Sequence, residues 1–131
     1  MTGYVADIEA LTEANDDFCQ VLYTGRHLQL ELMALEPRQD MGPETLAARD
    51  QFFHVETGHG EVVIDGVVHE VMAGSAIIVP AGAFHNLRNT GDEPMRLYTL
   101  YGPPNHVDHL VQATKADAFA PHETFEGTTT E

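Results

Sequence analysis

His85 lies in a segment with distinctive spacing, GSAIIVPAGAFHNLRN, which occupies residues 74–89. The segment follows the pattern G-x5-P-x-G-x2-H-x3-N. Ile77 to Val79 form a short apolar β run, Pro80 ends its hydrogen-bonding ladder, and Gly82 permits the turn that follows. His85 then begins the returning strand, with its imidazole directed to a fixed face. An imidazole held in this way can transfer protons or bind a metal ion.

This pattern resembles the second conserved motif of the cupin superfamily, which includes the RmlC-like jelly-roll proteins. In metal-binding cupins the histidine of this motif is a ligand inside a small β-barrel, so the resemblance implies that role for His85. The first cupin motif, G-x5-H-x-H-x(3,4)-E-x6-G, supplies the other three ligands of the family. Its counterpart here is DMGPETLAARDQFFHVETGHG, residues 40–60. The resemblance covers roughly residues 28–101.

The first motif departs from the family pattern at its ligand positions. When it is anchored on the strand at residues 51–55, Glu44 takes the first histidine position and Leu46 takes the second. Gln51 takes the glutamate position. A carboxylate is a competent oxygen donor, a carboxamide is a weaker neutral one, and leucine cannot bind a metal. The resemblance therefore implies a metal set of His85, Glu44 and Gln51, with Leu46 at a vacant ligand position.

Strand alternation predicts which side chains surround this set. Successive side chains of a strand point to opposite faces, so residues two and four positions after Gln51 share its face. The residue two positions after His85 shares the face of His85 in the same way. The predicted pocket walls are Leu46, Phe53, Val55 and Leu87. Gln29, Glu31 and Met33 form the less apolar face of an earlier strand, and the sequence leaves open which face of that strand turns inward.

Two functional interpretations follow, and both take Glu44 and His85 as the candidate catalytic residues. In the first, Mn(II), Fe(II) or Zn(II) bound by His85, Glu44 and Gln51 polarises a substrate as a Lewis acid. The family then implies isomerase, lyase or oxygenase chemistry on a small carbonyl or hydroxy-acid compound. In the second, a metal-free cupin binds a small polar ligand, and Glu44 and His85 form an acid–base pair. A purely structural barrel is the third reading.

The remaining patterns predict the elements that hold these residues. Residues 7–15 indicate a short helix with Asp7 as its N-cap. Residues 61–64 and 67–71 are two apolar runs joined by Asp65-Gly66, which is typical of a tight β-hairpin. Further strands are expected at 20–23, 27–35 and 95–101. We therefore predict an all-β protein, an antiparallel jelly-roll β-barrel in a single domain of residues 1–131. The barrel core is expected at about 20–102, and an irregular C-terminal extension at 105–131.

Charge and cysteine content limit the choice of partners. The chain has 21 acidic and 6 basic residues, a formal net charge of −15. Such an acidic protein repels phosphate backbones and anionic membranes, so we expect neither nucleic acid nor membrane as a partner, but a small-molecule ligand. The N-terminus has no signal-peptide pattern, and the single cysteine, Cys19, has no disulfide partner within the chain. Both features predict a cytoplasmic protein, with Cys19 acting as a small apolar residue.

The other histidines are expected to have structural or solvated roles. We expect His54 to point outward and His69 to be a buried, hydrogen-bonded imidazole. His106 and His109 form an H-x-x-H pair that gives only a weak zinc signal, because no third donor lies near them in the sequence. The solvated histidines are expected to be His27, His59 and His122.

An outward-facing apolar row predicts a homodimer. Exposed apolar rows of this size are uncommon on monomers, and single-domain cupins usually pair. The row consists of Leu28, Leu30, Leu32, Phe52 and His54.

Overall fold

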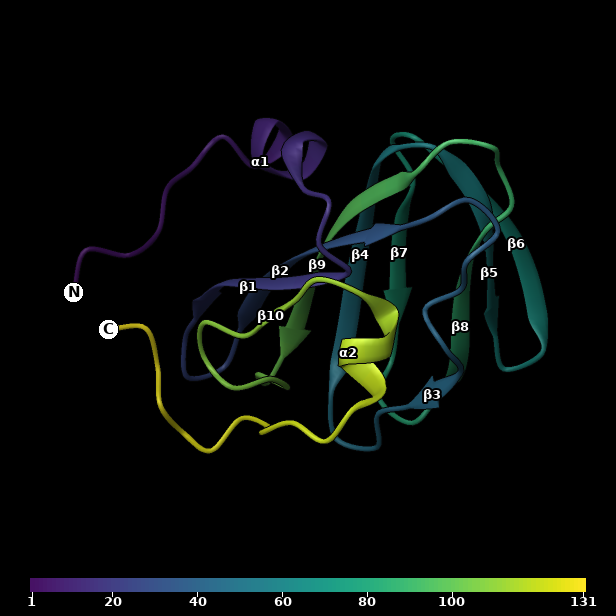
Figure 1. Ribbon diagram of the computed structural model, residues 1–131. Helices are drawn as coiled ribbons and strands as arrows, with labels where there is room; N and C mark the ends of the chain where they lie inside the picture. Colours follow the sequence, from purple (N-terminus) through teal and green to yellow (C-terminus); the bar gives the residue numbers. More distant parts are fainter.

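The computed structural model describes residues 1–131 as two facing β-sheets with a short helix near each end of the chain (Figure 1). The helices are α1 (Ile8–Ala14) and α2 (Lys115–Phe119). The strands are β1 (Cys19–Thr24), β2 (Gln29–Leu35), β3 (Glu44–Thr45), β4 (Asp50–Thr57), β5 (His59–Ile64), β6 (Val67–Met72), β7 (Ala76–Val79), β8 (Phe84–Asn89), β9 (Met95–Gly102) and β10 (Val111–Gln112).

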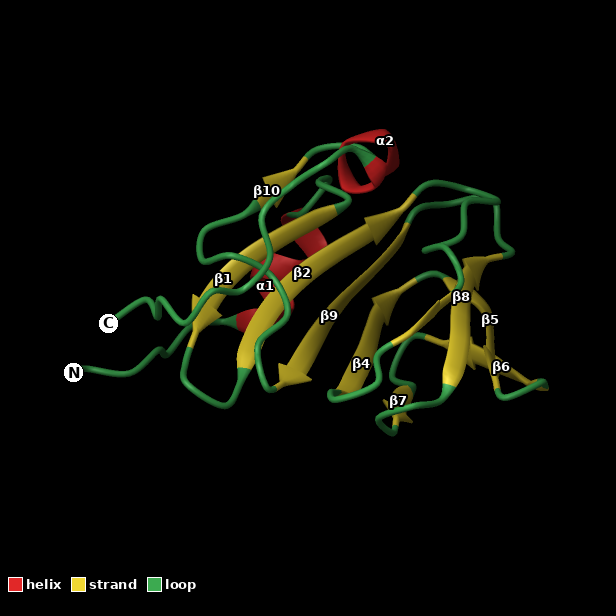
Figure 2. Cartoon of the chain, turned by 90° about the horizontal axis from the view of Figure 1, so that it is seen from below, coloured by secondary structure: helices red, strands yellow, loops and turns green.

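All strand pairs are antiparallel, as predicted for a jelly roll. The larger sheet has six strands in the order β10-β1-β2-β9-β4-β7, and the smaller sheet has four in the order β3-β8-β5-β6. Figure 2 shows the larger sheet extending from β10 toward β7, with β8, β5 and β6 beside its β7 end. The two sheets are not joined into a closed barrel, but their inner faces enclose one core.

The core confirms the predicted strand parity. Along β4, Gln51, Phe53 and Val55 are buried, whereas the intervening side chains are only partly buried. Along β8, His85 and Leu87 point inward in the same way. Fifteen buried residues from both sheets form one continuous apolar cluster. This core fixes the direction of the polar side chains that share its strand faces.

The local signals in the sequence were also correct. Asp65 and Gly66 both have positive φ, 45° and 82°, as a two-residue hairpin turn requires. The carboxylate of Asp7 accepts a hydrogen bond from the Ala10 amide at 3.1 Å and caps α1. Gly82 has φ of 88°, a conformation that side chains with a Cβ resist, so it forms the turn that leads into His85.

The apolar row predicted to form a dimer interface lies on the outer face of the larger sheet and is less exposed than expected. On this face α1 contacts β2, β4 and β9, Val5 and Ile8 lie beside Leu30, and Leu32 is only 2% exposed. Leu30, Phe52 and His54 are partly buried, and only Leu28 is largely exposed. The row is therefore not the open apolar surface we expected, because the chain covers much of it itself. The homodimer stays a prediction.

The C-terminal segment is more ordered than expected. Val111 and Gln112 form β10, which pairs with the start of β1. Thr114 caps α2, which has a capping box with Asp117. Lys115 of α2 forms an ion pair with Asp40. Gly42 leaves room for the Phe119 ring, since a Cβ at residue 42 would meet that ring at 2.6 Å. The segment thus folds back over one end of the space between the sheets (Figure 2).

The histidine predictions had mixed outcomes on the outer surfaces. His54 lies on the outer face and stacks on Tyr98, with ring centroids 5.2 Å apart, as an outward residue should. His69 was expected to be buried, and this was wrong. It lies on β6, the edge strand of the smaller sheet, where no further strand covers it. His27, His59 and His122 are exposed, as predicted. The structure contains no helix long and apolar enough to span a membrane.

Candidate functional site

A cavity of about 270 Å³ is lined by residues of both sheets and of the C-terminal segment. Its lining mixes apolar side chains with carboxylate, imidazole, amide and hydroxyl groups. The lining residues are Phe18, Met33, Met41, Glu44, Leu46, Tyr101, Asn105, His106, Gln112, Ala118, Phe119, His122 and Thr124. Two polar clusters adjoin this cavity, one on its β3–β8 side and one on its β1–β2 side.

The first cluster consists of the three residues predicted as the site. Glu44 of β3 and His85 of β8 are direct partners in the strand ladder, so their side chains leave the smaller sheet together. Glu44 Oε1 lies 3.8 Å from His85 Nε2, and Gln51 Oε1 lies 3.2 Å from the same nitrogen. His85 is only 1% exposed, whereas Glu44 lines the cavity. The structure therefore brings Glu44, Gln51 and His85 together, with Glu44 nearest the ligand space.

A chain of hydrogen bonds orients the amide of Gln51. The Thr99 hydroxyl donates to the Phe52 carbonyl at 2.8 Å, so it accepts from Gln51 Nε2 at 3.1 Å. Gln51 Oε1 consequently faces His85. The other imidazole nitrogen, Nδ1, lies 3.1 Å from the Ala83 carbonyl, which is also an acceptor. Acceptor oxygens therefore lie beside both ring nitrogens of His85.

This cluster fits a divalent metal ion of the kind that the fold implies. His85 Nε2 has Gln51 Oε1 and Glu44 Oε1 at 3.2 and 3.8 Å, spacings similar to those between neighbouring ligands of one ion. The ligand chemistry is modest, because only Glu44 carries a negative charge. Leu46 lines the cavity beside Glu44 and contributes no donor atom, as its motif position predicted.

The predicted pocket walls divide into two groups. Leu46 lines the cavity as expected. Phe53, Val55 and Leu87 are fully buried in the core and do not border the cavity. Their parity was correct, but they lie deeper than the ligand space because the core fills the region between them. The cavity is instead closed by residues of the C-terminal segment.

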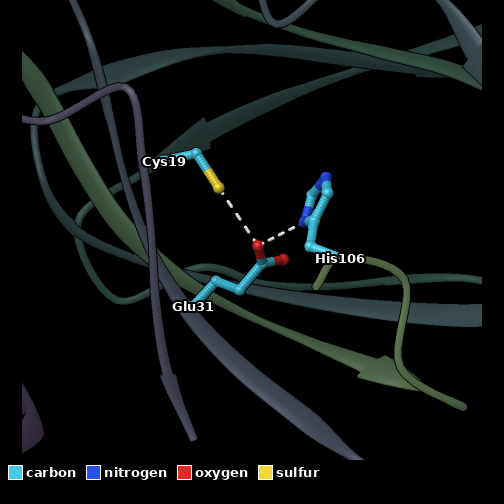
Figure 3. Close-up of side chains that lie close together, drawn as sticks. All are labelled: Cys19, Glu31 and His106. Atoms are coloured by element: carbon cyan, nitrogen blue, oxygen red, sulfur yellow. Dashed lines mark hydrogen bonds and ion pairs between the residues drawn. The ribbon is translucent and has the colours of Figure 1, made fainter. Parts of the chain in front are cut away.

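The second cluster joins Cys19 of β1, Glu31 of β2 and His106 from the segment after β9 (Figure 3). The Cys19 thiol donates to Glu31 Oε1 at 3.1 Å, and His106 Nδ1 lies 2.5 Å from the same oxygen. Cys19 and Glu31 are almost fully buried, while His106 lines the cavity. Glu31 Oε2 is buried without a hydrogen-bond partner. One carboxylate oxygen therefore accepts two bonds while the other accepts none.

Gln29 holds the main chain of His106 in place. Its Oε1 accepts from the backbone amides of Asn105 and His106 at 3.0 and 2.9 Å, and its Nε2 donates to the His106 carbonyl at 2.8 Å. The Tyr101 ring meets the imidazole of His106 edge-on, with centroids 5.6 Å apart. The imidazole is thus fixed by its backbone, by Glu31 and by an aromatic neighbour.

The two clusters influence each other electrostatically across the cavity. Burial raises the pKa of Glu44, an effect that His85 and His106 partly offset. Burial lowers the pKa of His106, but Glu31 and Glu44 raise it more, so the pKa ends above the usual histidine value. Burial and the nearby Glu31 raise the pKa of the Cys19 thiol well above its usual value. Glu44 and His106 therefore shift each other's pKa across the cavity.

Sequence reasoning did not identify the second cluster as a site. Cys19 was read as a small apolar residue, and His106 only as half of a weak H-x-x-H pair. His109 is exposed and belongs to no such cluster. The usable signal was the alternation of Gln29, Glu31 and Met33, whose face was left undecided and proves to be the inward one.

Comparison with known proteins places this architecture among its relatives. The uncharacterised protein YrkC of Bacillus subtilis is 42% identical over 123 residues, which cover 89% of this chain and 66% of YrkC. The chain thus spans about two thirds of the length of that relative. The crystal structure of BH2720 from Bacillus halodurans superposes with a TM-score of 0.89 at 41% identity, covering 90% of this chain and 94% of BH2720.

More distant structures share the fold alone. One is described as a predicted oxalate decarboxylase from Thermotoga maritima. It matches with a TM-score of 0.56 at 19% identity, over 57% of this chain and 65% of its own. The model of the cupin domain matches residues 31–101, more than half of the chain, so this protein belongs to the cupin domain family.

Proposed function

We propose that this cupin is an enzyme that transfers a proton at a carbon next to a carbonyl group, in a small carbonyl or hydroxy-acid compound bound in the cavity. Glu44 is the proton-transferring group in this proposal. The observation that carries it is the position of Glu44, which lines the cavity while its Oε1 faces buried His85 at 3.8 Å. A carboxylate open to a ligand on one side and supported by an imidazole on the other suits general acid–base catalysis.

The size and lining of the cavity support a small, oxygen-rich ligand. Its volume of about 270 Å³ lies just below the usual range for ligand pockets, roughly 300–1,000 Å³. Asn105, His106 and Thr124 offer polar contacts, and Met33 and Leu46 offer apolar ones. A short carbon skeleton with carbonyl, hydroxyl or carboxylate groups matches this mixture. The proposed partner is therefore a small molecule.

A metal-dependent form of the same chemistry is the second candidate. The convergence of lone pairs from His85, Gln51 and Glu44 favours it. These residues would hold Mn(II), Fe(II) or Zn(II), and the ion would polarise the carbonyl oxygen of the substrate. In that form Glu44 would bind the ion through one carboxylate oxygen and would accept the proton on the other. A chelator would then stop the reaction, whereas the metal-free reaction would continue.

Proton exchange tests the proposal without knowledge of the product. The full-length chain is incubated in D₂O with a panel of small 2-oxo acids, 2-hydroxy acids and hydroxyaldehydes, and loss of the proton next to the carbonyl is followed by NMR. We expect at least one compound to exchange. Replacement of Glu44→Gln should slow that exchange by about 10²–10⁴-fold, the usual contribution of general acid–base catalysis. Glu70→Gln, at an exposed glutamate on β6, is the matched control.

The outcomes separate the candidates. Exchange that survives chelation and is lost in Glu44→Gln supports the metal-free proposal. Exchange that is lost on chelation and restored by Mn(II), Fe(II) or Zn(II) supports the metal-dependent one. Exchange unchanged in Glu44→Gln, or absent for every compound of the panel, would contradict both.

A further inference from the structure

We propose that Cys19, Glu31 and His106 form a zinc site on the β1–β2 wall of the cavity. None of the three residues belongs to a cupin motif position, and the site lies on the opposite wall from Glu44 and His85. The inference goes beyond the proposed function and does not depend on proton transfer by Glu44.

The three donor atoms already converge (Figure 3). The Cys19 sulfur, a carboxylate oxygen of Glu31 and a ring nitrogen of His106 all lie within 4.8 Å of one another. Zinc takes such ligands at about 2.0–2.3 Å in a tetrahedron, which places neighbouring donors about 3.3–3.8 Å apart. The Sγ–Oε1 and Nδ1–Oε1 distances are 3.1 and 2.5 Å, so the donors need to separate only slightly to admit the ion.

The hydrogen bonding within the cluster is incomplete in a way that a cation would correct. Glu31 is only 1% exposed, and its Oε2 has no partner. A buried carboxylate oxygen without a partner is costly. A zinc ion would balance the charges of the Glu31 carboxylate and a Cys19 thiolate, leaving the buried site neutral. On binding, the thiol proton and the Nδ1 proton that was bonded to Glu31 are released, and the neutral imidazole carries its one proton on Nε2, the nitrogen turned away from Glu31 (Figure 3).

A candidate for the fourth ligand lies beside Cys19. Gln112 of β10 is the ladder partner of Cys19, so the two side chains leave their strands side by side. Gln112 is only 4% exposed, lines the cavity, and its Nε2 is buried without a hydrogen-bond partner. Its amide oxygen can complete the tetrahedron, or the position can remain open to water.

The donor set selects the class of ion. A thiolate with imidazole and carboxylate suits zinc or cobalt and disfavours magnesium, calcium and manganese. The Glu44, His85 and Gln51 cluster contains no sulfur. Sulfur ligation is therefore the feature that distinguishes the two walls in an experiment.

Cobalt(II) titration of the reduced, metal-free full-length chain tests the site. Cobalt bound to a thiolate gives a near-ultraviolet charge-transfer band, and tetrahedral cobalt gives strong visible bands. Cys19 is the only cysteine, so a charge-transfer band in the parent protein reports ligation by Cys19 even if a Cys19 variant fails to fold. We expect both sets of bands at one cobalt per chain and their loss when zinc is added.

Variants assign the other ligands. Cys19→Ala should remove the charge-transfer band, and Glu31→Gln and His106→Gln should each weaken cobalt binding at least tenfold. His109→Gln, which removes an exposed imidazole three residues from His106, should leave binding unchanged. Failure of the parent to bind cobalt, or binding without the charge-transfer band, would overturn the proposal. Neither outcome bears on proton transfer by Glu44, which the exchange experiment measures separately.

Discussion

The two walls of the cavity differ in how they are built and in how they face the ligand. On the β3–β8 wall, Glu44 and His85 are paired in one sheet, and Glu44 reaches the cavity. On the β1–β2 wall, Cys19 and Glu31 are buried, and His106 reaches them from the segment after β9. The carboxylate of Glu44 on the first wall is open to a ligand. The carboxylate of Glu31 on the second wall is enclosed by the thiol of Cys19 and the imidazole of His106. The same residue type therefore has different chemistry on each wall, set by its surroundings.

The largest expected effect is a gain in metal affinity when a histidine is placed at the vacant ligand position of the first wall. In a Cys19→Ala background, Leu46→His should raise affinity for cobalt or zinc at least tenfold, because a third strong donor joins His85 and Glu44. Affinity should fall as pH drops below the imidazole pKa of about 6.5, since protons compete for the nitrogen. Calorimetric titration measures the gain, with Leu46→Met as the control.

Adding His85→Ala to Leu46→His should abolish the gain. Equal and negligible binding by the parent and Leu46→His would show that residue 46 does not face the metal position. Glu44, Gln51 and His85 would then lie close together without forming a metal site.

We also expect substitutions next to the two clusters to lower the unfolding free energy by different amounts. Gln29→Leu removes the partners of two backbone amides and one carbonyl at Asn105 and His106. A fully buried orphaned group costs about 1–3 kcal/mol, but these three are only partly buried, so we expect a total loss of roughly 2–5 kcal/mol in unfolding free energy. Gln51→Leu should lower the unfolding free energy by about 1–2 kcal/mol less than Gln29→Leu does. The reason is that His85 keeps its contacts with Ala83 and Glu44. Urea denaturation measures both variants, and an equal or reversed order would show that the β1–β2 wall does not depend on Gln29.

The fold was largely predictable because its signals are local or occupy fixed positions. The spacing from Gly74 to Asn89 and the Asp65-Gly66 turn specify backbone conformations that few other sequences adopt. Strand alternation then placed Gln51 and His85 on the inward face. Half of the candidate site followed from these signals, since Glu44 occupies a motif position that pairs directly with His85.

The β1–β2 wall could not be predicted, for two physical reasons. The N-terminal segment and α1 cover the outer face of the larger sheet. Leu30 and Leu32 are therefore buried or partly buried on that face, while Glu31 points inward. Alternation alone cannot distinguish this arrangement from its reverse. The second reason concerns α2, which covers the cavity next to this wall. It has only five residues, too few to show a helical period in the sequence. Its position depends on tertiary contacts such as the one between Phe119 and Gly42.

The smallest expected effect concerns the segment that closes the cavity. Lys115 and Asn86 lower the pKa of Asp40 from its usual 3.8. A carboxylate whose folded pKa is lowered stabilises the protein above its unfolded pKa, and this contribution is lost as pH falls through the lowered value. Asp40→Asn should thus lower the melting temperature slightly near pH 6, by less than the equivalent of about 1 kcal/mol for this solvated pair. The difference should disappear at pH values well below 3.8. A difference that persists there would mean that Asp40 acts through packing and not through its charge.

A crystal structure of the protein with a compound that undergoes exchange tests the central claim most directly, because it shows where the ligand binds. The account predicts electron density in the cavity beneath α2. The carbon that loses its proton should lie next to Glu44, within reach of one carboxylate oxygen, while His85 supports that carboxylate from behind. Binding of the compound elsewhere, for example in the pocket lined by His69 of β6 and Ile77 of β7, would contradict the account. Binding in the cavity with the reactive carbon turned away from Glu44 would contradict it as well.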